Sequence, residues 1–194
     1  ADGCTGTRIV GCEIADLGAG GIRVDGANAD CPKSLRTGNS IITDNHIPHG
    51  GQVFMSAVGV FLKDTYGNKV MHNHIHNLYY SGISCGWVWG YTDSVSKDNH
   101  LEKNLIHDLG FGLLSDMGGI YTLGPQPGTR ICGNVIYNVE RASYGGWGVY
   151  LDEGSSHIIV EDNICYSLSS QGFHQHYGRE NIVRNNIFAL NREG

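Results

Sequence analysis

The chain has 194 residues and a formal net charge of −6 at pH 7. That length is enough for one domain with a real core, and the acidic balance argues against a nucleic-acid partner. Its 29 glycines are about twice the usual share of ~7%, and its charged fraction of 16% is below the usual ~25%. This composition excludes a disordered chain and a helical bundle, and it favours a turn-dense β architecture.

One frame recurs along the chain: an apolar residue, Asn three positions later, an apolar residue two after that, and another three further on. The asparagines of the clear copies are Asn73, Asn104, Asn134, Asn163 and Asn185. Imperfect copies begin at Ile9 and Ile42. Most copies are about 30 residues apart, a period typical of solenoids. Because neither end carries an obvious cap, we expect a section of a longer chain.

A second short strand follows each copy, marked by Gly and an apolar residue. The six pairs are Gly21-Ile22, Gly59-Val60, Gly82-Ile83, Gly119-Ile120, Gly148-Val149 and Gly172-Phe173. No helical periodicity is sustained. The sequence therefore predicts one all-β domain over residues 1–194, a right-handed parallel β-helix of about six to seven coils with its Asn column stacked at a turn.

Strand alternation sorts the second strand into columns. With the residue after Gly pointing inward, Tyr121, Tyr150 and His174 share one outward column, and Asp152 and His176 share the next. Three coils carry extra residues before this strand, including Ser115-Asp116 and the segment 144–147. Function tends to lie on such loops, so we expect a site on this outer face.

Asp116, Asp152 and Glu153 are the candidate catalytic carboxylates. Glycoside hydrolysis needs a proton donor and a second carboxylate. Strand counting places Asp116 at the start of a strand and Asp152 at the end of one, so the loop with Asp116 must fold over the face. Asp152 has Glu153 as a like-charged neighbour, which tends to raise its pKa, and is assigned as the acid. The alternative is that Asp116 caps a turn and Asp152 bonds local amides.

Rings and imidazoles near these carboxylates are candidate substrate-binding groups. Aromatic faces suit sugar rings, and imidazoles can bond hydroxyls or tune a carboxylate. A loop packing on its own side chains is the alternative for the two tryptophans of the third coil. The candidates are Tyr121, Trp147, Tyr150, His174, His176, Trp87 and Trp89.

His72, His74 and His76 alternate in one stretch, and His76 aligns with His107, Tyr137, Tyr166 and Phe188. We interpret this as a stacked ring column outside the coil rather than a metal site. There is no C-x-x-C pair, so a zinc site is not indicated. We expect neither a metal nor a cofactor. No apolar run approaches the ~18 residues of a membrane span, so a membrane is not an expected partner.

The cysteines divide by position. Cys85 and Cys165 fall at inward strand positions and should be buried and unpaired. Cys4 and Cys31 lie about one coil apart and could form a disulfide.

The runs SDMGGIYTLG, DEGSS and GFHQHYGR resemble a known family. They are similar to bacterial right-handed β-helix proteins of glycoside hydrolase family 141, over about residues 40–190. The resemblance implies a secreted or periplasmic enzyme of fucosidase or xylanase type acting on a polysaccharide or oligosaccharide. It also implies a catalytic pair of aspartates that maps onto Asp116 and Asp152.

Three functions are therefore open. The leading one is a glycoside hydrolase of plant or microbial polysaccharide. A polysaccharide lyase would need a base near a uronate, usually with Ca²⁺, Arg or Lys to acidify the α-proton. Arg23 and Lys63 lie on the outward face but away from the acidic residues. The third is a carbohydrate-binding β-helix without catalysis.

Overall fold

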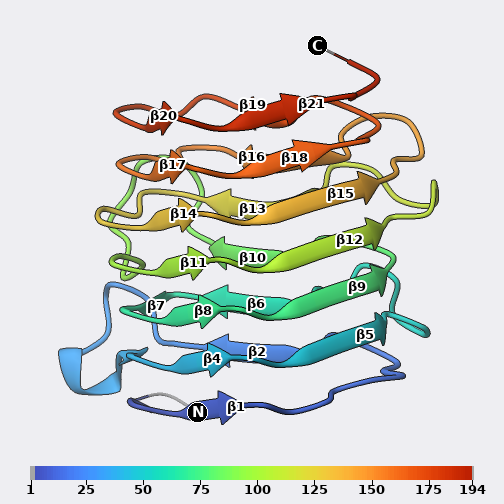
Figure 1. The fold of residues 1–194 in the computed structure, drawn as a ribbon. Helices are drawn as coiled ribbons and strands as arrows, with labels where there is room; N and C mark the ends of the chain where they lie inside the picture. The colour runs from blue at the N-terminus through green and yellow to red at the C-terminus, as the bar shows by residue number, and fades with distance from the viewer. Residues whose placement is uncertain (1–2, 194) are drawn as a thin grey trace.

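The computed structural model describes residues 3–193 and shows a parallel β-helix whose coils stack from the N-terminus to the C-terminus (Figure 1). Each coil contributes three short strands, and every paired strand is parallel to its partners in the coils before and after. The only helical element within the described residues is the 3-10 turn η1 (Lys33–Leu35). The predicted fold class is confirmed. Each coil has a third strand, because the chain bends at the Asn position.

Strands of equal position in successive coils form three long sheets. The first sheet has seven strands: β1 (Arg8–Val10), β4 (Ile41–Thr43), β8 (Lys69–Met71), β11 (His100–Glu102), β14 (Arg130–Cys132), β17 (Ile159–Glu161) and β20 (Ile182–Arg184). The second has six: β5 (His46–Gly50), β9 (His74–Leu78), β12 (Leu105–Leu109), β15 (Val135–Val139), β18 (Ile164–Tyr166) and β21 (Ile187–Ala189).

The third sheet also has six strands, and its outer face is where the sequence predicts the site. Its members are β2 (Ile22–Asp25), β6 (Val60–Lys63), β10 (Ile83–Gly86), β13 (Gly118–Leu123), β16 (Trp147–Leu151) and β19 (Phe173–Gln175). A two-stranded pair, β3 (Thr37–Gly38) and β7 (Thr65–Tyr66), completes the strands of the described chain. Figure 1 shows the third sheet behind the other two.

The core is a set of aliphatic stacks, one residue per coil. Ile83 pairs in register with Val60 and Ile120, which continue the stack on either side of it. Ile47, Ile75 and Ile106 stack in the same way on the second sheet, and all three are fully buried. Because the apolar positions recur at a constant register, each coil closes the core of its neighbour.

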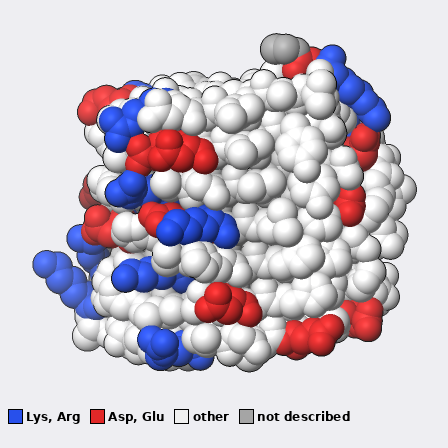
Figure 2. All heavy atoms as spheres, in the orientation of Figure 1, with Lys and Arg blue, Asp and Glu red and all other residues white. Residues whose placement is uncertain are grey.

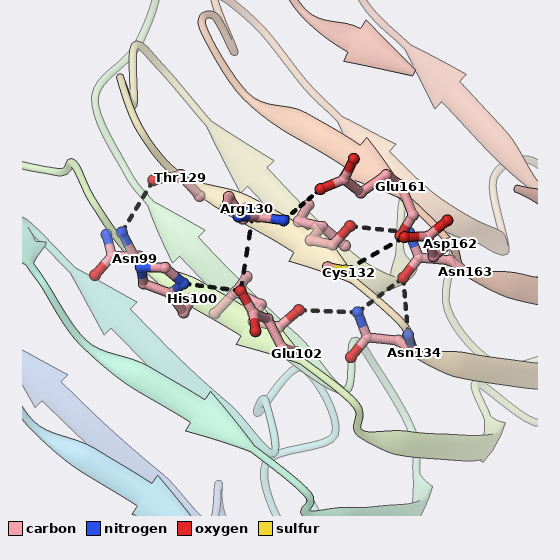
Figure 3. Close-up of polar contacts among 12 residues, drawn as sticks. Asn99, His100, Glu102, Thr129, Arg130, Cys132, Asn134, Glu161, Asp162 and Asn163 are labelled. Atoms are coloured by element: carbon pink, nitrogen blue, oxygen red, sulfur yellow. Dashed lines mark hydrogen bonds and ion pairs between the residues drawn. The ribbon is translucent and has the colours of Figure 1, made fainter. Parts of the chain in front are cut away.

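The predicted Asn ladder is confirmed and runs along the bend between the first and second sheets. The side chain of Asn104 donates to Asn134 Oδ1 at 3.0 Å, and that of Asn134 donates to Asn163 Oδ1 at 2.9 Å. Each of these amides also donates to a backbone carbonyl, as Asn134 does to Leu101. Figure 3 shows Asn134 and Asn163 in this arrangement. The buried amides are satisfied by one another, which fixes the coil spacing.

The last repeat differs from the prediction by one residue. Asn163 bonds Asn186 Oδ1 at 2.9 Å, whereas Asn185 has a positive φ of 55°. Phe188 consequently pairs with Cys165 at an inward position, and Ala189 follows Tyr166 in the outward column. Asn185 and Asn186 are adjacent, and an apolar residue lies three positions before each of them. The repeat pattern alone favours Asn185, which is the wrong one.

Cysteines are free throughout the described residues. Cys85 and Cys165 are fully buried, as predicted, and burial raises the pKa of each thiol to about 12. Cys4 is exposed and Cys31 is half-buried. Both are unpaired, so the disulfide considered between them is absent. No helix of the described chain is long and apolar enough to cross a membrane.

Candidate active site

The outer face of the third sheet holds a hollow of about 370 Å³ over strands β13, β16 and β19. All three candidate carboxylates line it, together with five of the predicted binding residues and one additional tyrosine. The lining residues are Trp89, Asp116, Tyr144, Trp147, Tyr150, Asp152, Glu153, His174 and His176.

The loop before β13 brings Asp116 over this face, as the pairing with Asp152 requires. Asp116 has a left-handed backbone, with φ of 60°, and its N–H donates to the Tyr144 carbonyl of the next coil at 3.1 Å. Gly145 permits the approach, because a Cβ there would lie 2.8 Å from the Asp116 nitrogen and its φ is 84°. The Tyr80 hydroxyl donates to the Asp116 carbonyl at 2.7 Å.

Tyr150 links the two aspartates. Its hydroxyl donates to Asp116 Oδ1 at 3.2 Å and also lies within hydrogen-bonding reach of the Asp152 carboxylate. Since both carboxylates reach one phenol oxygen, their nearest oxygens are no more than about 7 Å apart. That limit is compatible with the carboxylate separations that glycoside hydrolases use. The catalytic roles of these residues remain a prediction.

Asp152 is buried, with 4% of its surface exposed, and is surrounded by donors. Tyr121 donates to Oδ2 at 2.5 Å, and His176 Nδ1 lies 2.9 Å from Oδ1. Burial opposes ionisation, but these hydrogen bonds outweigh it and lower the pKa of the Asp152 carboxyl. The expected rise in this pKa, on which the assignment of Asp152 as the acid depends, is therefore wrong. The donors around Asp152, which include the backbone N–H of Glu153, stabilise its charged form.

Glu153 follows the end of β16, where strand alternation no longer applies. Its side chain turns into the same hollow instead of facing the opposite way. The Tyr177 hydroxyl donates to Glu153 Oε2 at 2.6 Å. Glu153 is thus a third carboxylate within the hollow.

Rings form one wall of the hollow. His174 stacks on Trp147 with centroids 4.3 Å apart and an angle of 5° between the planes. Trp147 is held in place by its indole N–H, which donates to Gln171 Oε1 at 2.8 Å. Burial, with His176 nearby, lowers the pKa of His174, so this imidazole is neutral at neutral pH. The wall is therefore flat and uncharged, a surface suited to a sugar ring.

Two predicted binding residues lie outside the hollow. Tyr121 is 6% exposed and sits behind Asp152 as a donor, not as a lining group. Trp87 packs on Tyr121 and lines a separate, more apolar hollow with Phe61. Trp89, two residues on, is exposed and does reach the acidic hollow.

Tyr144 is the lining residue that the sequence pattern does not single out. It is exposed and contacts Asp116 through its hydroxyl. Its position in the inserted segment 144–147 is the available signal. Tyr144 and Asp116 come from loops of adjacent coils. They meet because both loops fold over the edge of the sheet.

Comparison with known proteins identifies the family. The model for the right-handed beta helix region matches residues 1–119, more than half of the chain, so the protein belongs to that family and the right hand of its coil is confirmed. A solved structure named "Glycoside hydrolase" matches with a TM-score of 0.81 and 24% identity, over 95% of this chain and 33% of that one. At this identity the likeness establishes the shared fold. The chain spans about a third of that protein's length. No curated protein matches.

Proposed function

We propose that the protein is a glycoside hydrolase of plant or microbial polysaccharide, with fucosidase- or xylanase-like activity at the acidic hollow. The observation that carries this proposal is the Tyr150 hydroxyl, which lies within bonding reach of both Asp116 and Asp152. Two carboxylates held at that separation beside flat ring faces are what the reaction needs. The name of the similar solved structure supports the same class.

The two aspartates take different roles. Asp152 is kept ionised by its donors, so it serves as the nucleophile or as the base that activates water. An ionised carboxylate cannot donate the proton, and that role passes to Asp116. Tyr150 positions both: burial and the neighbouring Asp152 hold the pKa of its phenol far above the usual value, so it remains a donor.

The chemistry of the hollow favours hydrolysis over elimination. A lyase that neutralises its uronate substrate with Lys or Arg needs one beside the bound sugar, but among the described residues that line the hollow there is neither. The three acidic side chains would repel such a substrate. A neutral sugar avoids that repulsion.

A panel of neutral and acidic polysaccharides tests the class of reaction. We expect release of reducing sugar without an unsaturated product. An unsaturated product that absorbs in the near ultraviolet would indicate a lyase, and saturable binding without turnover would indicate a binding protein.

The proposal includes a secreted or periplasmic location. A polysaccharide too large to cross a membrane must be cleaved outside the cytoplasm. Fractionation of the producing cells tests this, and an enzyme confined to the cytoplasm would contradict it.

A further inference from the structure

Four histidines gather on the outer face of the second sheet, away from the acidic hollow. His46 pairs in register with His74, and His76 with His107, across three successive coils. Their rings pack 4.4 to 5.1 Å apart. Figure 2 shows charged side chains gathered on the left, over the first sheet, and few over the second. The cluster itself is flanked by the carboxylates of Glu13 and Asp108.

Stacking accounts for part of the cluster only. The predicted column is confirmed from His76 through His107 and Tyr137 to Tyr166, whose neighbouring rings are nearly parallel. A ring column needs flat faces, which tyrosine supplies equally well. Stacking does not require imidazole at four positions. It also does not explain why the ring nitrogens of the four histidines point at one another.

The ring nitrogens converge in pairs. His46 Nε2 lies 2.9 Å from His76 Nε2, and His74 Nε2 lies 2.7 Å from His107 Nε2. One ligand nitrogen from each of His46, His74 and His76 falls within 4.8 Å of the others. Two nitrogens bound to one metal at ~2.0–2.1 Å lie about 2.9–3.4 Å apart. The spacing of the pairs is close to that of ligands sharing an ion.

Oxygen acceptors set the tautomers on the far side of the rings. His76 Nδ1 lies 3.2 Å from Asn77 Oδ1, and His107 Nδ1 lies 2.8 Å from Asp108 Oδ2. Each Nδ1 therefore carries the proton, and each Nε2 turns a lone pair toward its partner. In each close pair one proton then sits between two nitrogens, where a metal ion could replace it. A carboxylate behind a ligating histidine is a frequent arrangement in metal sites.

Among the described residues, a second cluster also has ligand atoms at the spacing of a metal site. One of its carboxylates is not available to a metal ion, because it is already paired. Cys132, Glu161 and Asp162 lie on the first sheet (Figure 3). Both oxygens of Glu161 are already engaged, one by Arg130 and the other by Arg184. A cation would have to displace two guanidinium groups there, whereas an ion among the histidines displaces only the proton shared within each pair.

We propose that His46, His74 and His76 bind one divalent transition-metal ion of the kind that prefers imidazole, Zn²⁺, Ni²⁺ or Cu²⁺, with His107 as a fourth ligand. Because the ligands come from β5, β9 and β12, the ion ties three coils together. It stabilises the solenoid and takes no part in the chemistry of the acidic hollow.

Titration of the chelator-stripped protein with zinc chloride, followed by calorimetry, tests the site. We expect one zinc ion per chain and a higher melting temperature with zinc. His46→Ala and His74→Ala should each weaken binding about tenfold or more, and Asp108→Asn should weaken it by about 10–100-fold as a residue behind the ligands. His72→Ala is the matched control, since this exposed histidine of the same stretch lies at the β8–β9 bend, and it should bind as the unaltered protein does.

Three results would overturn the proposal. They are an absence of saturable zinc binding, equal weakening by His72→Ala, and loss of binding in Asp116→Asn, which would place the ion in the acidic hollow. Cobalt(II) binding to the unaltered protein is a test that does not depend on the folding of any variant. We expect visible absorption bands of nitrogen ligation, and bands of all-oxygen ligation would count against the histidines.

Discussion

At the scale of single residues, the site depends on how Asp152 remains charged while buried. Burial alone would raise its pKa, yet phenol and imidazole donors reverse the direction. Since its pKa is lower in the folded chain, Asp152 stabilises the fold at pH values above the ordinary aspartate pKa. That contribution is lost as the pH falls through the depressed value.

Tyr121→Phe tests this balance. Removing the hydroxyl leaves one oxygen of Asp152 without its 2.5 Å donor, so the pKa of Asp152 should rise. If Asp152 acts as base or nucleophile, the acidic limb of the kcat/KM profile should move to higher pH. Tyr166→Phe, a stacked tyrosine of the second sheet, is the control. An unmoved acidic limb in Tyr121→Phe would mean that Asp152 does not govern it.

Gly145→Ala tests the contact that places Asp116. The added Cβ would lie 2.8 Å from the Asp116 nitrogen, so the loop must shift and turnover should fall strongly. Gly112→Ala is a matched control, because its φ is also positive at 71° but the nearest atom to the new Cβ is 3.8 Å away. Both variants should lose roughly 1–2 kcal/mol of stability from left-handed strain. Equal turnover in the two would contradict the positioning role of this contact.

At the scale of elements, the Asn ladder shows what the sequence can predict. The columns of the third sheet follow from strand alternation and from a Gly that marks every coil, and Tyr121, Tyr150 and His174 do share a register. The repeat frame misplaces the last coil because either asparagine of the pair at 185 and 186 fits the spacing. Local spacing cannot resolve such a choice, since stacking on Asn163 decides it.

Asn104→Ala measures the strength of the ladder. The Asn104 side chain accepts from Asn73 and donates to Val70 O and Asn134. Each buried partner left unsatisfied costs ~1–3 kcal/mol, so the free energy of unfolding should fall by about 3 kcal/mol or more. Asn28→Ala, at an exposed loop position where the side chain accepts the Asp30 N–H, should lower it by only about 1 kcal/mol or less. Urea denaturation provides both values, and a small loss at Asn104 would mean that the amides are dispensable.

At the scale of the whole molecule, a uniform scaffold carries a localised site. Stacked coils place residues about 30 apart in sequence side by side, and loops inserted into neighbouring coils close over one face. The sequence predicts which face carries the acidic residues, because columns follow from alternation. It does not predict that Tyr121 lies behind Asp152 or that Tyr144 reaches Asp116, because those positions depend on loop conformation and side-chain packing.

The rate of reducing-sugar release by Asp152→Asn and Asp116→Asn, on a polysaccharide that the unaltered protein cleaves, tests the proposed function most directly. Each change removes a carboxylate but keeps the side-chain shape, so turnover should fall by several orders of magnitude while the melting temperature changes little for Asp116→Asn. Glu140→Gln is the control, because it alters a surface ion pair with Arg192 outside the hollow and should retain full activity. Turnover within a few fold of the unaltered rate in either aspartate variant would contradict the pairing of Asp116 with Asp152.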